Sequence, residues 1–75
     1  MSKVKIGPYT FDIFGLNRVM EEMLNNGYRA KPNEEIQAEL LKRLSRENYI
    51  PDVWRKYYGE AFLREFKKLV TEHSD

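Results

Sequence analysis

Few side chains in this sequence could carry acid–base, nucleophilic or metal chemistry. His73 is the single histidine and lies in the tail, and the chain contains no cysteine. A catalytic triad or a zinc site normally needs several imidazole or thiolate groups held close together. The sequence therefore predicts a solvated His73, no catalytic residue and no metal ligand, and we do not expect an enzyme.

Two pairs of adjacent carboxylates, Glu21–Glu22 and Glu34–Glu35, are the next candidates. Neighbouring residues of a helix point in different directions, so neither pair is expected to share one site. We interpret the first pair as part of a solvated helix face and the second as partners of a helix dipole. The sequence contains no glycine-rich phosphate-binding motif, so no cofactor is predicted.

Glu65 is the one carboxylate that the helical pattern places awkwardly. At about 100° per residue it falls near the middle of an apolar arc on the helix expected over 52–71. A carboxylate in such a place must find a hydrogen-bond partner or take up a proton. We interpret Glu65 as a structural polar anchor that fixes helix packing, with a polar anchor in a binding groove as the alternative. Its candidate partners are the backbone N–H groups of another helix start and the side chains of Tyr28, Arg29, Arg43, Tyr49 and Tyr58.

The start of this helix carries more aromatic and aliphatic side chains than a small core can hold. An exposed patch of this kind is typical of a partner-binding surface. In the alternative interpretation, Tyr49 and Ile50 fold back under the helix and Leu63 is an ordinary exposed leucine. The predicted partner-binding residues are Tyr49, Ile50, Trp54, Tyr57 and Leu63.

Basic residues along the same helix suggest a second kind of partner. They could form a positive stripe for nucleic acid, with helices joined in the manner of a helix-turn-helix. Three glutamates, at positions 60, 65 and 72, interrupt them, and the net charge is only +1, which favours an ordinary solvated surface. The residues of this nucleic-acid alternative are Arg55, Lys56, Arg64, Lys67 and Lys68.

A β-hairpin is predicted at about residues 3–11. Polar and apolar residues alternate on both sides of Gly7-Pro8, a pair suited to a tight turn because glycine accepts a positive φ. The hairpin would present a small apolar face to the helices, since a lone hairpin is marginal in water. An extended arm with a turn is the alternative. The apolar face would contain Val4, Ile6, Tyr9 and Phe11.

Three helices are predicted at about 13–26, 34–46 and 52–71. Asp12 is suited to cap the first helix and Gly27 to end it, whereas Gly15 needs either a close packing contact or a later helix start. Asn33 is expected to cap the second helix. Pro51 is tolerated at the start of the third helix, because an N–H in the first helical turn has no partner within the helix and its absence costs little.

The helical periodicities place one apolar face of each helix around a common core. We expect Trp54 and Phe62 to be largely buried there, with Phe66 on the flank of its helix. The predicted fold is mainly α, a small α+β domain spanning 1–75, in which an N-terminal β-hairpin packs on a three-helix core. The other expected members of this core are Leu16, Met20, Ile36 and Leu40.

The sequence suggests an accessory role in the cytoplasm. No apolar run approaches the ~20 residues that a membrane span needs, and the first residues lack the apolar region of a signal peptide. The layout is similar to that of many small prokaryotic accessory domains, without a motif that indicates a family. We expect a non-enzymatic module that binds another protein or a second copy of itself through the aromatic-rich region, with weak nucleic-acid binding as the alternative.

Overall fold

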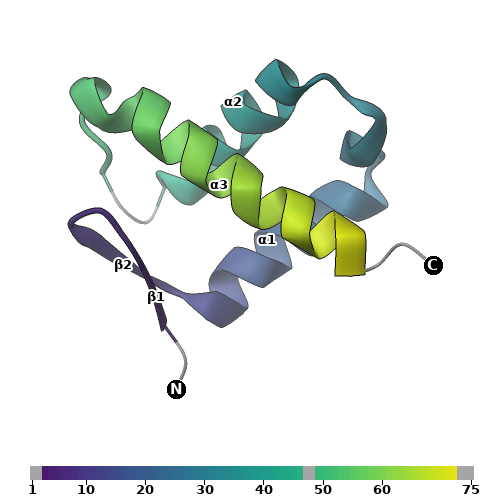
Figure 1. Cartoon of the computed structure of the whole chain (residues 1–75), viewed down its shortest axis with the longest axis horizontal. Helices are drawn as coiled ribbons and strands as arrows, with labels where there is room; N and C mark the ends of the chain where they lie inside the picture. Colours follow the sequence, from purple (N-terminus) through teal and green to yellow (C-terminus); the bar gives the residue numbers. More distant parts are fainter. Residues whose placement is uncertain (1–2, 47–48, 73–75) are drawn as a thin grey trace.

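The computed structural model describes residues 3–46 and 49–72. A hairpin is followed by three helices and one short 3₁₀ turn (Figure 1), which confirms the mainly α fold with a hairpin packed on helices. In Figure 1, α3 crosses the molecule in front of the other helices, and the hairpin lies beside its first half. The elements are β1 Lys3–Ile6, β2 Tyr9–Asp12, α1 Ile13–Asn25, η1 Tyr28–Ala30, α2 Asn33–Leu44 and α3 Asp52–Glu72.

The hairpin has the turn that the sequence predicts. Ile6 pairs with Tyr9 in the antiparallel ladder, which leaves Gly7 and Pro8 as the two turn residues. Gly7 has a φ of 60°, a backbone conformation that side chains with a Cβ rarely adopt. Of the four residues on the predicted apolar face, Ile6 and Phe11 are buried, while Val4 and Tyr9 are partly buried against the core.

Both predicted signals at the ends of α1 are confirmed. The Asp12 carboxylate accepts a hydrogen bond from the backbone N–H of Phe14 at 3.2 Å, and Gly27 follows the helix with a φ of 82°. Our two explanations of Gly15 are wrong. The helix already begins at Ile13, and a Cβ built on Gly15 would meet no atom within 4 Å.

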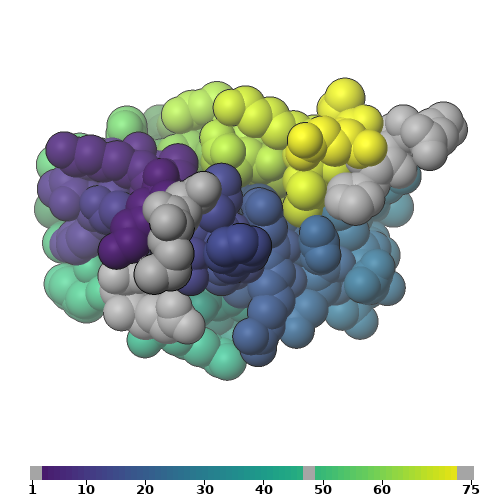
Figure 2. All heavy atoms as spheres, turned by 90° about the horizontal axis from the view of Figure 1, so that it is seen from below, coloured from purple at the N-terminus to yellow at the C-terminus, as the bar shows by residue number. Residues whose placement is uncertain are grey.

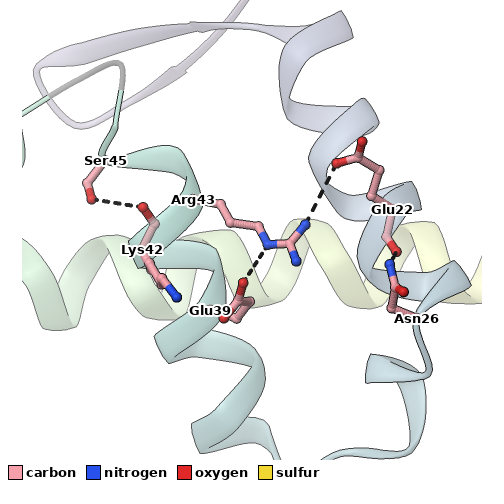
Figure 3. Close-up of polar contacts among 6 residues, drawn as sticks. All are labelled: Glu22, Asn26, Glu39, Lys42, Arg43 and Ser45. Atoms are coloured by element: carbon pink, nitrogen blue, oxygen red, sulfur yellow. Dashed lines mark hydrogen bonds and ion pairs between the residues drawn. The ribbon is translucent and has the colours of Figure 1, made fainter.

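The start of α2 differs by one residue from the prediction. Pro32, not Asn33, is the N-cap: its carbonyl accepts the N–H groups of Glu35 at 3.0 Å and Ile36 at 3.1 Å. Pro32 can do so because a cap residue needs an extended backbone, and proline at φ −61° and ψ 150° has one. At the other end, the Ser45 hydroxyl donates to the Lys42 carbonyl (Figure 3), and the helix ends two residues before the predicted 46.

One apolar cluster joins the hairpin and the three helices. Phe62 is fully buried in it, as predicted. Trp54 is not: 41% of its surface is exposed, and the prediction that it is buried is wrong. Every residue from Asp52 to Tyr57 is exposed and burial begins at Tyr58, so this first part of α3 extends beyond the core. The other expected core members, Leu16, Met20, Ile36 and Leu40, are all buried.

Candidate interaction surface at the start of α3

Tyr58 attaches the hairpin to α3. Its side chain is fully buried, and its hydroxyl donates a hydrogen bond to the carbonyl of Ile6 at 2.6 Å. The turn sits directly on this hydroxyl, since a Cβ added at Gly7 would lie 2.6 Å from it. Burial raises the pKa of Tyr58, which keeps the hydroxyl a donor. The hairpin therefore has a fixed position against the helix.

Aromatic rings connect this buried anchor to the surface. The Tyr58 ring lies 5.8 Å from Phe62 on its inner side and 5.3 Å from Tyr57 on its outer side. Tyr57 in turn meets Trp54 edge to face at 5.8 Å. Edge-to-face pairs of this kind add about 0.5–1.5 kcal/mol to the burial of their area. The contacts connect two exposed side chains, Trp54 and Tyr57, to the buried Tyr58 ring.

Four exposed apolar side chains gather where α3 begins, and we call them the aromatic end. The exposed fractions are 77% for Tyr49, 82% for Val53, 41% for Trp54 and 44% for Tyr57. The last three share one arc of the helix at about 100° per residue. In Figure 2 the hairpin (purple) lies at one end of the molecule, and α3 extends from that end to its yellow final turns at the other. The start of α3 therefore presents apolar surface to solvent.

Three of the five predicted partner-binding residues belong to the aromatic end: Tyr49, Trp54 and Tyr57. Ile50 does not, because it is buried in the core, and Leu63 is partly buried against the same core. The alternative interpretation, in which Tyr49 and Ile50 fold back under the helix, therefore agrees with the burial of Ile50. It is wrong for Tyr49, which is exposed. The sequence prediction missed Val53, although its position four residues before Tyr57 places it on the same helix face.

Glu65 is not the buried anchor that the helical pattern predicts. Its side chain is 33% exposed and accepts a hydrogen bond from the Lys68 ammonium at 3.3 Å. No charged side chain is buried in the part of the chain that the structure describes. The prediction fails because α3 is rotated: Phe66, expected on the flank, is fully buried and shifts the centre of the inner face away from Glu65.

The five predicted basic residues are all exposed but do not form one stripe. Arg55 and Arg64 are nine positions apart, which places them on opposite sides of α3 at about 100° per residue. Arg64, Lys67 and Lys68 lie close together and border a depression of about 460 Å³ beside the start of α2. The depression is lined by Arg64, Lys67 and Lys68 together with Asn33, Leu63 and Thr71.

A second polar cluster joins α1 to α2 (Figure 3). Arg43 donates to Glu39 on its own helix and lies 3.7 Å from Glu22 on α1. The hydrogen bond from Arg43 is the main reason why the pKa of Glu39 lies below its ordinary value. These groups are paired with one another across the contact between α1 and α2.

Nothing in the described residues adds a site for metal chemistry. No three His, Cys, Asp or Glu side chains within residues 3–46 and 49–72 come together as metal ligands. His73 lies outside the described residues. The described helices are also too short or too polar to cross a membrane.

The chain matches no protein-family model, no curated protein and no solved structure. The geometry of the aromatic end is therefore the main guide to function.

Proposed function

We propose that this chain is a non-enzymatic protein-interaction module that binds its partner through the aromatic end. The observation that carries the proposal is the exposure of Tyr49, Val53, Trp54 and Tyr57 at the start of α3. Tyrosine and tryptophan are enriched at the centres of protein interfaces because each covers a large area and loses little conformational entropy. A cytoplasmic location, as expected from the sequence, is part of this proposal.

Weak nucleic-acid binding is the second candidate. The grouping of Arg64, Lys67 and Lys68 around one depression supports it. The position of Arg55 on the opposite side of the helix weakens it, since a phosphate backbone is followed by a continuous row of cations. For this reason we rank it below protein interaction.

Affinity capture with matched variants tests the proposal. The tagged chain, the double variant Trp54→Ala with Tyr57→Ala, and the control Phe14→Ala would be used in parallel on an extract of the source cells. Phe14 is a suitable control because it is an exposed aromatic residue on another helix. Light scattering of the same three proteins reports self-association.

We expect the wild type and Phe14→Ala to bind the same partner, or to form the same dimer, and the double variant to lose it. Loss of one buried aromatic anchor typically costs 2 kcal/mol or more, which is roughly a 30-fold loss of affinity. An identical set of captured proteins and an identical mass for all three chains would refute the proposal.

A further inference from the structure

The outer face of α3 changes its chemistry along its length. Val53 and Tyr57 stand four residues apart at the aromatic end, and Arg64 and Lys68 stand four residues apart further on. At about 100° per residue all four lie on one side of the helix. All four are exposed. One continuous helix face is therefore apolar in its first half and basic in its second.

The basic half borders a shallow depression, and no carboxylate belongs to the described residues that line it. Arg64, Lys67 and Lys68 stand around the partly buried Leu63 in the depression of about 460 Å³. Lys68 also binds Glu65, but 72% of its side chain remains exposed. The depression thus combines three cations with an apolar floor, which complements an acidic segment carrying apolar side chains.

We propose that the outer face of α3 binds an acidic amphipathic segment of a partner protein. This inference rests on the proposed function and names the chemistry of the partner. The segment places an apolar anchor on the aromatic end and carboxylates on Arg64, Lys67 and Lys68. Tyr57 and Lys67 are about 15 Å apart along the helix axis, at 1.5 Å per residue. The anchor and the carboxylates of the partner are separated by the same distance, which is about ten residues of a helix.

The observations favour a protein segment over a nucleic acid. The three grouped cations span only about 6 Å of the axis, from position 64 to position 68. Glu60 stands between the two halves of the face and would repel a phosphate backbone that followed it. Apolar Val53, at the far end, suits an aliphatic or aromatic side chain of a protein.

A designed peptide tests the proposal directly. The probe is an amidated helical peptide of about 18 residues without tryptophan, with leucines in one half and glutamates in the other. Its control carries glutamine in place of every glutamate. Trp54 is the single tryptophan of the chain and belongs to the aromatic end, so its fluorescence emission reports contact at this surface. A labelled single-stranded RNA is the third probe.

We expect the glutamate peptide to shift Trp54 emission to the blue and to bind at least about five times more tightly than the glutamine peptide. The double variant Arg64→Glu with Lys67→Glu should lower its affinity about tenfold. Glu60→Lys should raise the affinity about two- to five-fold, because it replaces the carboxylate between the two halves of the face with a cation. Arg18→Glu is the matched control, since Arg18 is an exposed cation on α1, and it should change the affinity less than about two-fold.

Three outcomes would overturn the inference. Equal affinities for the two peptides, or binding of neither, would show that the basic half does not recognise carboxylates. The proposed function would then be tested separately, by affinity capture with the double variant of Trp54 and Tyr57. Tighter binding of the RNA, lost in the same charge variants, would identify a nucleic-acid surface. A concentration-dependent Trp54 shift without any peptide would show that a second copy of the chain covers the face.

Discussion

The first two turns of α3 and the turns that follow differ in what covers them, although they belong to one helix. From Asp52 to Tyr57 every side chain is exposed, whereas Tyr58, Ala61, Phe62, Phe66 and Leu69 are buried. Both segments contain aromatic residues. The comparison shows that composition alone does not decide whether an aromatic side chain stabilises the fold or remains free to bind a partner: its position relative to the neighbouring elements does.

Truncating one ring in each segment should give the largest contrast. Phe62→Ala is expected to lower the free energy of unfolding by about 3–5 kcal/mol, because it leaves a cavity among fully buried neighbours. Trp54→Ala should cost less than about 1.5 kcal/mol, since Trp54 is exposed and its ring meets Tyr57 and Tyr58 edge to face. Thermal or urea denaturation of both variants measures the difference. Equal losses would show that the first turns of α3 are part of the core.

Tyr58 and Tyr57 stand at the boundary between the two segments and offer a finer test. Tyr58→Phe removes the buried hydrogen bond to Ile6 and should cost about 1–2 kcal/mol. Tyr57→Phe removes a hydroxyl from an exposed side chain and should cost almost nothing. Urea melts of the two variants at neutral pH give these values.

The pH dependence of stability should separate the same two tyrosines. Because burial raises the pKa of Tyr58 above its ordinary value of 10.0, the folded state binds this proton more tightly than the unfolded state. Its contribution is fully present below about pH 10 and is lost as the pH rises through the higher pKa of the folded state. Urea melts at neutral and at alkaline pH should therefore show that Tyr57→Phe, which keeps Tyr58, loses stability as the pH rises. Tyr58→Phe should lose less stability over the same pH range. Parallel curves would contradict this.

The start of α1 is a second helix end outside the core, and it should yield a gain of stability. Gly15 lies in helical backbone, and the space into which a side chain would project is open. Gly15→Ala should raise the free energy of unfolding by about 0.5–1 kcal/mol, because alanine has less backbone freedom to lose on folding. A loss instead would mean that a neighbour approaches this position in solution.

The smallest expected effect concerns two glutamates of the buried segment of α3. Glu65→Ala removes a partly exposed pair with Lys68, and Glu60→Ala removes an exposed carboxylate. Both variants should lie within a few tenths of a kcal/mol of the wild type. A cost of several kcal/mol for Glu65→Ala alone would restore the buried anchor that the helical pattern predicts.

Local signals of the sequence were sufficient for the hairpin and for the ends of α1. The Gly7-Pro8 turn, the Asp12 cap and the Gly27 stop each depend on the backbone preferences of one or two residues. Such preferences act within a few residues and can be read without knowing the rest of the fold. The order and type of the main elements follow from them and from the apolar periodicity.

The orientation and overhang of α3 could not be predicted in the same way. Its apolar residues cover a wide arc, and periodicity alone places Trp54 on the inner face and Phe66 only on its flank. Packing against α1 and α2 selects a rotation that buries Phe66, whereas Trp54 is exposed because the first part of α3 extends beyond the core. Both outcomes depend on residues distant in the sequence. The same error of rotation produced the wrong environment for Glu65. The aromatic end was recognised in part because its composition exceeds what a core of this size can hold.

The hydrogen bond between Tyr58 and Ile6 has a consequence for the order in which the chain folds. It connects positions 52 residues apart, so the hairpin made first during synthesis cannot dock until the start of α3 has followed. Until then its apolar face lacks the rings of Tyr58 and Phe62, which Phe11 contacts in the folded chain, and a two-stranded hairpin alone is marginal in water. Closing such a distant contact is slow compared with forming a helix. The hairpin should therefore be the last part to settle on the folded chain and the first to leave it, which amide hydrogen exchange of Val4 and Phe11 would record.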